Sequence, residues 1–243
     1  MNSDFVLYLH GFMGVGEDFR RIAEDVGLPY LLPDLAGHGG NAGQAVDFGS
    51  QARVLIKMLD DNGVSSCRAV GYSMGGRLAL YLAIHYPERV SGLVLESASP
   101  GLQNEVDRVA RIASDEDWAA RLEFDFFGDV LDAWFSQEVF ISLRESPLLR
   151  EIKTQRLSQD SKALARALQG FSLGRQASLW DQLGELAIPV LLISGEQDPK
   201  FRETMSQMAL LISNSRHVII DGAGHMPHVE RPELVAQLLK RFF

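Results

Sequence analysis

The sequence predicts an α/β fold built on a mostly parallel sheet that is covered by helices on both faces. Short apolar runs alternate with stretches of helical periodicity along most of the chain. The apolar runs are nearly continuous, which is typical of strands buried on both faces of a parallel sheet. One long interval, 101–187, contains helical stretches and no clear strand. The sheet is therefore expected to form from the segments on either side of it.

Six apolar runs are predicted as strands: 5–9, 30–32, 68–71, 90–95, 190–193 and 216–220. Helices are expected around 19–26, 52–59, 74–86 and 232–243. The interval 101–187 is predicted to be a helical cap or lid inserted between two strands. In sheets of this kind the catalytic groups lie in loops at the carboxyl ends of the strands.

Composition limits the classes of function. The chain has 243 residues, of which 46% are apolar and 23% charged, and we expect one globular domain over 1–243. Its formal net charge of −9 argues against nucleic acid or an anionic membrane surface as a partner. A single cysteine, Cys67, excludes an internal disulfide and any metal site built from several cysteines. No apolar segment is long enough to span a membrane, so a cytoplasmic location is expected.

A serine motif lies where the chemistry is expected. Gly71-Tyr72-Ser73-Met74-Gly75 fits G-x-S-x-G, with a predicted strand before it and a predicted helix after it. A strand–turn–helix of this kind holds the serine hydroxyl exposed on a strained turn, and the helix N-terminus favours developing negative charge. The alternative is a serine that only caps the helix. The context predicts that Ser73 is catalytic.

A serine hydroxyl needs a base, and the chain offers six histidines. His225 follows Gly222-Ala223-Gly224 in the loop after the last predicted strand, from which it could reach the serine. His228 is the rival, and we interpret it as a neighbour in the same loop. His10 and His38 lie in glycine-containing turns where structural hydrogen bonding is expected, and His85 is expected on a helix surface.

The base in turn needs an orienting acid. Asp198 lies in the loop after the strand 190–193, which gives the chain order Ser…Asp…His. Its carboxylate would hold the imidazole in the tautomer that accepts the serine proton. Glu196 is the alternative acid, and either carboxylate could instead cap the helix that follows.

An oxyanion hole is expected from the same geometry. His10-Gly11-Phe12 follows the first strand, so the Phe12 backbone N–H can join that of Met74, the residue after the nucleophile. Two such donors can stabilise a developing oxyanion.

These motifs together resemble the α/β-hydrolase superfamily over essentially the whole chain. The matching segments are His10 to Phe12, Asp34 to Gly39, Gly71 to Gly76 and Gly224-His225. The resemblance implies an α/β-hydrolase fold with a cap between the sixth and seventh family strands. Because the chain enters directly on the His-Gly strand, the usual opening hairpin is missing or short, and about six strands are expected.

A narrower set of motifs resembles the MenH family of 2-succinyl-6-hydroxy-2,4-cyclohexadiene-1-carboxylate synthases, which act in menaquinone and phylloquinone biosynthesis. The motifs are Gly71 to Arg77, Glu96-Ser97, Ser99 to Asn104, Arg108, Arg111, Ser114-Asp115, Trp134 to Gln137, Val139-Phe140 and Asp198 to Arg202. Two departures are Glu138, where proline is common in the family, and Pro199, where a serine can occur. Neither affects the three predicted catalytic residues.

The resemblance implies a substrate and the residues that bind it. The family substrate is a small cyclohexene with three carboxylates, and its elimination of pyruvate needs no metal or organic cofactor. Arg77, Arg111 and Arg156 match the family's carboxylate-binding arginines, although Arg111 and Arg156 could instead be solvated cap residues. A guanidinium suits this task because its planar fork binds a carboxylate through two hydrogen bonds. Tyr72 and Trp134 are expected to contact the substrate or to pack in the core.

The implied mechanism uses Ser73 as a base that removes a ring proton, without an acyl-enzyme. Two other functions remain open at this point. A hydrolase of esters or carbon–carbon bonds would use the same triad as a nucleophile but would leave the arginines unexplained. A non-catalytic receptor for a small molecule could also retain the fold and the triad.

Overall fold

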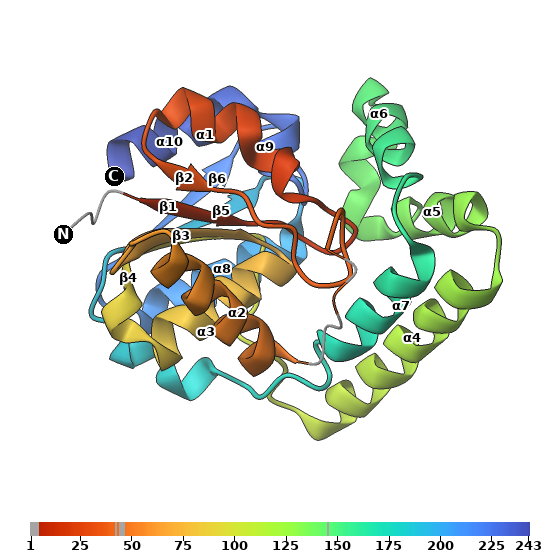
Figure 1. The fold of residues 1–243 in the computed structure, drawn as a ribbon, viewed down its shortest axis with the longest axis horizontal. Helices are drawn as coiled ribbons and strands as arrows, with labels where there is room; N and C mark the ends of the chain where they lie inside the picture. The colour runs from red at the N-terminus through yellow and green to blue at the C-terminus, as the bar shows by residue number, and fades with distance from the viewer. Residues whose placement is uncertain (1–4, 42, 44–46, 145) are drawn as a thin grey trace.

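The computed structural model describes residues 5–41, 43, 47–144 and 146–243, so the first four residues of the predicted domain lie outside it. Its centre is a six-stranded sheet in the order β2-β1-β3-β4-β5-β6, and every pair of neighbouring strands is parallel. Helices cover both faces of this sheet, and a group of further helices lies beyond one end of it (Figure 1). The predicted α/β-hydrolase fold, with six strands and a helical cap, is confirmed.

All six predicted strands are present, with ends that differ by one or two residues. They are β1 (Val6–Leu9), β2 (Tyr30–Leu31), β3 (Cys67–Tyr72), β4 (Val90–Glu96), β5 (Val190–Gly195) and β6 (Ser215–Ile220). Tyr72 at the end of β3 pairs with Glu96 of β4, and Glu96 pairs with Ile193 of β5. The carboxyl ends of the three central strands therefore lie side by side, and the loops that follow them meet above one edge of the sheet.

The helices divide between the two faces (Figure 1). On one face lie α1 (Arg20–Val26), which follows the short helix η1 (Gly16–Phe19), then α9 (Pro227–Glu230) and α10 (Pro232–Phe242). On the other face lie α2 (Phe48–Asp61), α3 (Met74–His85) and α8 (Pro199–Leu211). A short helix η2 (Pro87–Arg89) leads into β4. Each face has its own cluster of fully buried side chains, centred on Leu7, Leu78 and Leu192 in one and on Val6, Val70 and Leu191 in the other.

The interval between β4 and β5 forms the predicted cap. Its elements are α4 (Glu105–Phe124), α5 (Phe127–Phe135), η3 (Glu138–Leu143), α6 (Pro147–Arg156), α7 (Ser161–Gly170) and η4 (Trp180–Glu185). Helices α4 and α7 lie against each other beyond the sheet, and α5 and α6 continue the cap on the far side (Figure 1). We call helices α4 to α7, with η3, the cap.

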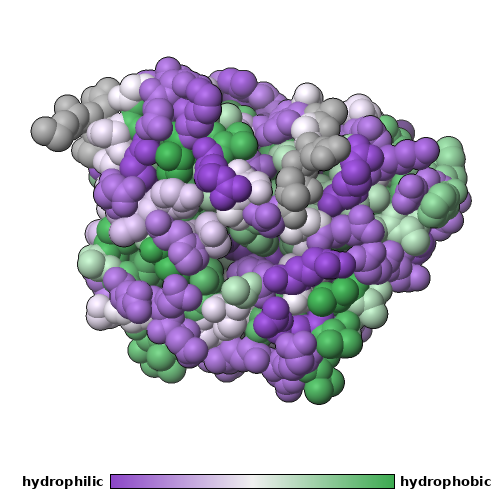
Figure 2. All heavy atoms as spheres, turned by 60° about the horizontal axis from the view of Figure 1, so that its bottom comes forward, coloured by the Kyte–Doolittle hydropathy of each residue, from purple (hydrophilic) through white to green (hydrophobic). Residues whose placement is uncertain are grey.

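Hydrophilic side chains cover most of the face drawn in Figure 2, and hydrophobic ones form separate areas on it. Among the described residues, no helix is both long and apolar enough to cross a membrane.

The single cysteine provides a test of this packing. Cys67 at the start of β3 is 1% exposed, and burial raises the pKa of its thiol to about 12. Because the thiolate is the reactive form, we expect Ellman's reagent to modify the folded protein very slowly at pH 8. The same reagent should react fully within minutes in guanidinium chloride. Rapid labelling of the folded protein would contradict the buried position of β3.

Candidate active site

Ser73 lies on a strained turn between β3 and α3. Its backbone has φ 49° and ψ −109°, in the region that non-glycine residues rarely adopt. The close approach of this turn to β1 requires glycine at position 75, because a Cβ there would lie 2.1 Å from the Leu9 carbonyl oxygen. The Ser73 side chain makes no capping hydrogen bond to α3. The alternative interpretation, a serine that only caps the helix, therefore does not agree with the structure.

Asp198 and His225 form a buried pair beside this turn. The His225 Nδ1 lies 2.7 Å from Asp198 Oδ2, and both side chains are at most 6% exposed. The other carboxylate oxygen, Oδ1, accepts a hydrogen bond from the Phe201 N–H and so caps α8. Asp198 is thus fixed by the helix that follows it, and it fixes one nitrogen of the imidazole.

The second nitrogen of His225 faces the serine. Its Nε2 lies 3.4 Å from Ser73 Oγ, at the long end of a hydrogen bond. Separations of this kind are common between a serine and its base before substrate binds. The rings of Phe140 and Phe201 lie 5.7 and 4.7 Å from the imidazole and restrict its rotation. The structure therefore brings together the three side chains that the sequence predicted.

The alternatives for the acid and the base lie elsewhere. The side chain of His228 is 1% exposed, and its Nδ1 lies 2.6 Å from Glu96, so its ring does not face the serine. Glu196 is exposed and accepts a hydrogen bond from the Gly222 N–H.

Two other histidines have structural contacts, as expected. Burial lowers the pKa of both His10 and His38. A neutral His10 ring accepts a hydrogen bond from the Leu35 N–H through its Nε2, and the His38 Nδ1 lies 3.1 Å from the Ala36 carbonyl. His85 is exposed on α3.

The loop after β1 packs against the serine turn. Gly11 lies so close to Tyr72 that a Cβ at this position would be 2.5 Å from the tyrosine ring and 3.5 Å from the Ser73 Cβ. Phe12 and Met74 both line a cavity that also includes Ser73. Phe12 and Met74 thus lie on the two segments next to the serine.

A large cavity opens above the triad, between the sheet and the cap. It has a volume of about 680 Å³, and its lining includes Ser73, His225, Arg111 and Trp134. A narrower recess of about 100 Å³ also includes Ser73 and extends to Arg77 and Arg111. A substrate in this space would contact the serine and both arginines.

Arg77 is a buried cation with neutral hydrogen-bond acceptors. Its guanidinium donates to the Gln176 Oε1 at 2.9 Å and to the Phe171 carbonyl at 2.8 Å. Burial and, to a lesser extent, the neighbouring Arg111 lower the pKa of Arg77 to about 9, and Asp115 opposes this. A bound carboxylate would offset both effects, so the recess favours an anionic ligand.

Arg111 is held toward the cavity by a carboxylate on its own helix. Its Nε lies 2.8 Å from Asp115 Oδ1, one turn further along α4. The second oxygen of Asp115 accepts a hydrogen bond from Ser172 at 2.7 Å. The side chain of Arg111 is 34% exposed, whereas that of Asp115 is 4% exposed, so the cation is accessible and its anchor is not.

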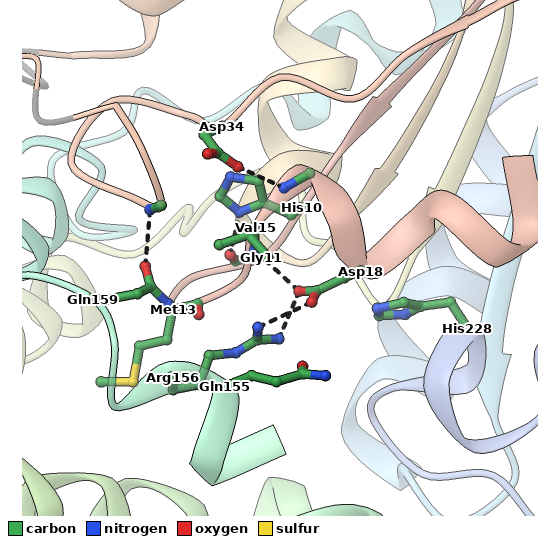
Figure 3. A network of polar contacts seen from close by, with 12 residues as sticks. His10, Gly11, Met13, Val15, Asp18, Asp34, Gln155, Arg156, Gln159 and His228 are labelled. Carbon is green, nitrogen blue, oxygen red and sulfur yellow. Dashed lines mark hydrogen bonds and ion pairs between the residues drawn. The ribbon is translucent and has the colours of Figure 1, made fainter. Parts of the chain in front are cut away.

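Arg156 forms an ion pair with Asp18 (Figure 3). Its guanidinium donates two hydrogen bonds to Asp18, at 3.0 and 2.6 Å, and the two side chains are only 3% and 9% exposed. Arg156 and Asp18 line a small hollow of about 10 Å³ together with Phe12, Tyr72 and Trp134. The structure therefore places Arg156 next to the large cavity, in an ion pair that joins α6 to η1.

Tyr72 and Trp134 have mixed surroundings. Both line the large cavity. Tyr72 is only 6% exposed, and its ring lies 5.4 Å from that of His225. The indole of Trp134 packs between Phe12 and Trp118, with ring centroids 5.0 Å from each.

The sequence analysis assigned no individual role to several residues of the site, although Asp115 and Lys200 lie within its family motifs. Lys200 and Trp118 line the large cavity, and Asp115 and Asp18 pair with two of the arginines. A carboxylate four residues after Arg111 on a predicted helix was a usable signal for Asp115. No local pattern links Asp18 to Arg156, which lies 138 residues further along. Within the described part of the chain, no group of three or more His, Cys, Asp or Glu could hold a metal ion.

Comparison with known proteins assigns the family. Residues 4–232 match the family model described as alpha/beta hydrolase fold. The 2-succinyl-6-hydroxy-2,4-cyclohexadiene-1-carboxylate synthase of Salmonella typhimurium is 36% identical over 242 residues, which cover 97% of this chain and 93% of that protein. The chain belongs to the 2-succinyl-6-hydroxy-2,4-cyclohexadiene-1-carboxylate synthase family. The predicted resemblance is thereby confirmed.

Two further relatives support the family. The structure of MenH from S. aureus has a TM-score of 0.93 and 32% identity, and the match covers 100% of this chain and 94% of that one. Protein PHYLLO, chloroplastic, of Arabidopsis thaliana is 31% identical over 257 residues, which cover 97% of this chain but only 15% of that protein. The segment of PHYLLO that is similar to this chain is thus part of a much longer protein.

Proposed function

We propose that this member of the synthase family eliminates pyruvate from 2-succinyl-5-enolpyruvyl-6-hydroxy-3-cyclohexene-1-carboxylate, a step of menaquinone or phylloquinone biosynthesis. The product is 2-succinyl-6-hydroxy-2,4-cyclohexadiene-1-carboxylate. One observation carries the proposal: Ser73, Arg77 and Arg111 line a single recess. A hydrolase of neutral esters does not need two arginines beside its serine. An enzyme whose substrate carries three carboxylates needs such cations to bind it.

Ser73 acts as the base in this mechanism. His225, oriented by Asp198, accepts the proton of the Ser73 hydroxyl, and the serine oxygen removes the ring proton next to the succinyl ketone. The 2.7 Å contact between His225 and Asp198 supports this assignment, because it leaves the other imidazole nitrogen facing the serine. No bond forms between Ser73 and the substrate.

Loss of the ring proton produces an enolate. The Phe12 and Met74 N–H groups hold its oxygen, at the place where negative charge develops. The electrons then re-form the ketone and shift through the ring, and the bond between the ring and the enolpyruvyl oxygen breaks. Enolpyruvate leaves and takes up a proton to become pyruvate. No metal or organic cofactor enters these steps.

The arginines bind the three carboxylates. Arg77 and Arg111 serve two of them from the recess beside Ser73, and Tyr72 and Trp134 contact the ring from the large cavity. We assign the third carboxylate to Arg156, which must then exchange or share its hydrogen bonds to Asp18. The ligand is a small anion, and an acidic chain with one cysteine suits work in the cytoplasm without a nucleic acid partner.

A pyruvate-release assay with the enolpyruvyl substrate tests the proposal. The wild-type protein is expected to release one pyruvate per substrate consumed, and absence of pyruvate would overturn the assignment. The competing function, ester hydrolysis with Ser73 as nucleophile, predicts an acyl group on Ser73 during turnover of a simple ester. Intact-protein mass spectrometry would detect that group.

Replacing Arg111 by alanine is expected to raise KM about ten- to a hundredfold with little change in kcat. The reason is that a hydrogen bond to a charged group contributes about 1.5–3 kcal/mol, and this contact to a remote carboxylate is the same in substrate and transition state. Steady-state kinetics of pyruvate release measure both constants. Arg166→Ala, an exposed arginine on α7, is the matched control and should leave KM unchanged. An Arg111→Ala variant with wild-type KM would remove Arg111 from the binding site.

A further inference from the structure

Two buried carboxylates outside the triad hold the segment that carries His225. The first is Glu230, at the end of α9 and 9% exposed. Its Oε2 accepts a hydrogen bond from the Gly224 N–H at 3.0 Å, and its Oε1 accepts one from the Met226 N–H at 3.1 Å. These two amides lie on either side of His225. Glu230 therefore fixes the backbone immediately before and after the histidine.

The second carboxylate is Glu96, at the carboxyl end of β4. Its Oε1 accepts a hydrogen bond from the His228 N–H at 3.0 Å and lies 2.6 Å from the His228 Nδ1. The backbone carbonyl of the same residue accepts a hydrogen bond from the Ser73 N–H at 2.8 Å. One residue thus holds the serine turn through its main chain and the helix after His225 through its side chain.

Aromatic packing completes the connection. The His228 ring stacks on Phe19 at 4.7 Å and lies 4.6 Å from Tyr72, whose ring also contacts His225 at 5.4 Å. Tyr72 directly precedes Ser73 in the chain. The serine turn and the histidine segment are therefore joined by a continuous set of contacts on the side of the sheet that carries α1 and α9.

Stability alone does not account for these carboxylates. Burying a charge is costly unless it is paired and hydrogen-bonded, and replacing buried ionic groups by apolar ones of similar volume is often neutral or stabilising. Directional hydrogen bonds to particular backbone amides fix the position of a backbone segment, which apolar packing does less strictly. They can hold a backbone segment to within about 0.5 Å of one position.

We propose that Glu96 and Glu230 are positioning residues that set the distance between the His225 imidazole and the Ser73 hydroxyl. The proposal rests on the function proposed above, since that function gives Ser73 its role as the base and His225 its role as the acceptor of the serine proton. Misplacement of reacting groups by 1 Å can cost on the order of a hundredfold in rate. The His225 Nε2 and the Ser73 Oγ are already 3.4 Å apart, so a further increase in this distance would break the hydrogen bond between them.

The test compares Glu230→Gln and Glu96→Leu with a matched control, Glu233→Gln. Leucine at position 96 removes the acceptor of both His228 contacts, which a glutamine oxygen would keep. Glu233 lies three residues after Glu230, in the next helix α10, is 60% exposed and pairs with Arg21 at the surface. An amide retains the size of the carboxylate, but its NH₂ group cannot accept a hydrogen bond, so Glu230→Gln can satisfy only one of the two amides. Three quantities are measured for each variant: the melting temperature, kcat and KM for pyruvate release, and the imidazole resonances of His225 in long-range ¹H–¹⁵N spectra.

Both test variants are expected to lower kcat roughly ten- to a hundredfold, with KM within about twofold of wild type. The His225 ring resonances should shift in both, and the Glu233→Gln protein should match wild type in every measurement. Folded test variants with wild-type kcat would overturn the proposal, and so would a fall in kcat with unchanged His225 resonances.

Two safeguards keep the test decisive. If Glu230→Gln does not fold, Glu230→Asp keeps the charge and shortens its reach, and the same fall in kcat and the same shift in the His225 resonances are expected. The resonances are recorded without substrate, so they decide the positioning role even if wild type releases no pyruvate. That result would overturn only the proposed function.

Discussion

Replacing Ser73 by alanine is expected to lower kcat for pyruvate release by roughly 10²–10⁴-fold, the range typical of a lost general base. The methyl group cannot accept the ring proton, and His225 lies too far behind it to replace the missing oxygen. Ser73 acts on the substrate in the transition state and does not bind it in the ground state, so KM should change little. Single-turnover pyruvate release with excess enzyme measures the loss directly.

The control for this variant is Ser91→Ala, which removes a hydroxyl near the opposite end of the neighbouring strand β4, where it donates to the Cys67 carbonyl. It should retain the wild-type rate. If Ser73→Ala also retains that rate, the base must be another group, and the proposed chemistry fails even though the fold is unchanged.

Replacing Asp18 by alanine is expected to lower the free energy of unfolding by about 3–5 kcal/mol. The change leaves the Arg156 guanidinium without its carboxylate at a position where the side chain is 3% exposed. It also removes the acceptor for the Val15 N–H, which bonds to Asp18 Oδ2 at 3.1 Å. Urea unfolding, monitored by circular dichroism at constant temperature, gives the difference in free energy.

Two comparisons show whether this loss comes from the unpaired cation. Asp61→Ala breaks an exposed pair with Lys57 and is expected to cost less than about 1 kcal/mol. The double variant Asp18→Ala, Arg156→Met removes both charges and should recover part of the stability. If Asp18→Ala costs no more than Asp61→Ala, the ion pair between α6 and η1 does not stabilise the fold.

The strands and the triad could be predicted because their signals are local. Each strand is an apolar run with a turn on either side, and even the two-residue β2 was found at the right place. Ser73 follows β3 directly, and Asp198 and His225 lie in the loops after β5 and β6, so chain order and loop position indicated all three. In the structure Asp198, and not Glu196, pairs with His225, and its other carboxylate oxygen caps α8.

The residues that hold the site residues in place could not be predicted, because most of them pair with residues that are distant in the chain. Arg156 matched a family position, but its ion pair with Asp18 spans 138 residues and has no periodic signal. The same is true of Glu96 and His228, which are 132 residues apart. Glu230 lies close to the residues it holds, but nothing in the local sequence distinguishes it from a surface glutamate such as Glu233.

The most direct test of the account follows two products of the wild-type enzyme in one time course. Pyruvate is measured by a coupled dehydrogenase, and the conjugated ring diene by its ultraviolet absorbance. Elimination by Ser73 as a base predicts that both accumulate at the same rate and reach equal amounts. Pyruvate without the diene would show that water cleaves the enol ether, and it would contradict the account.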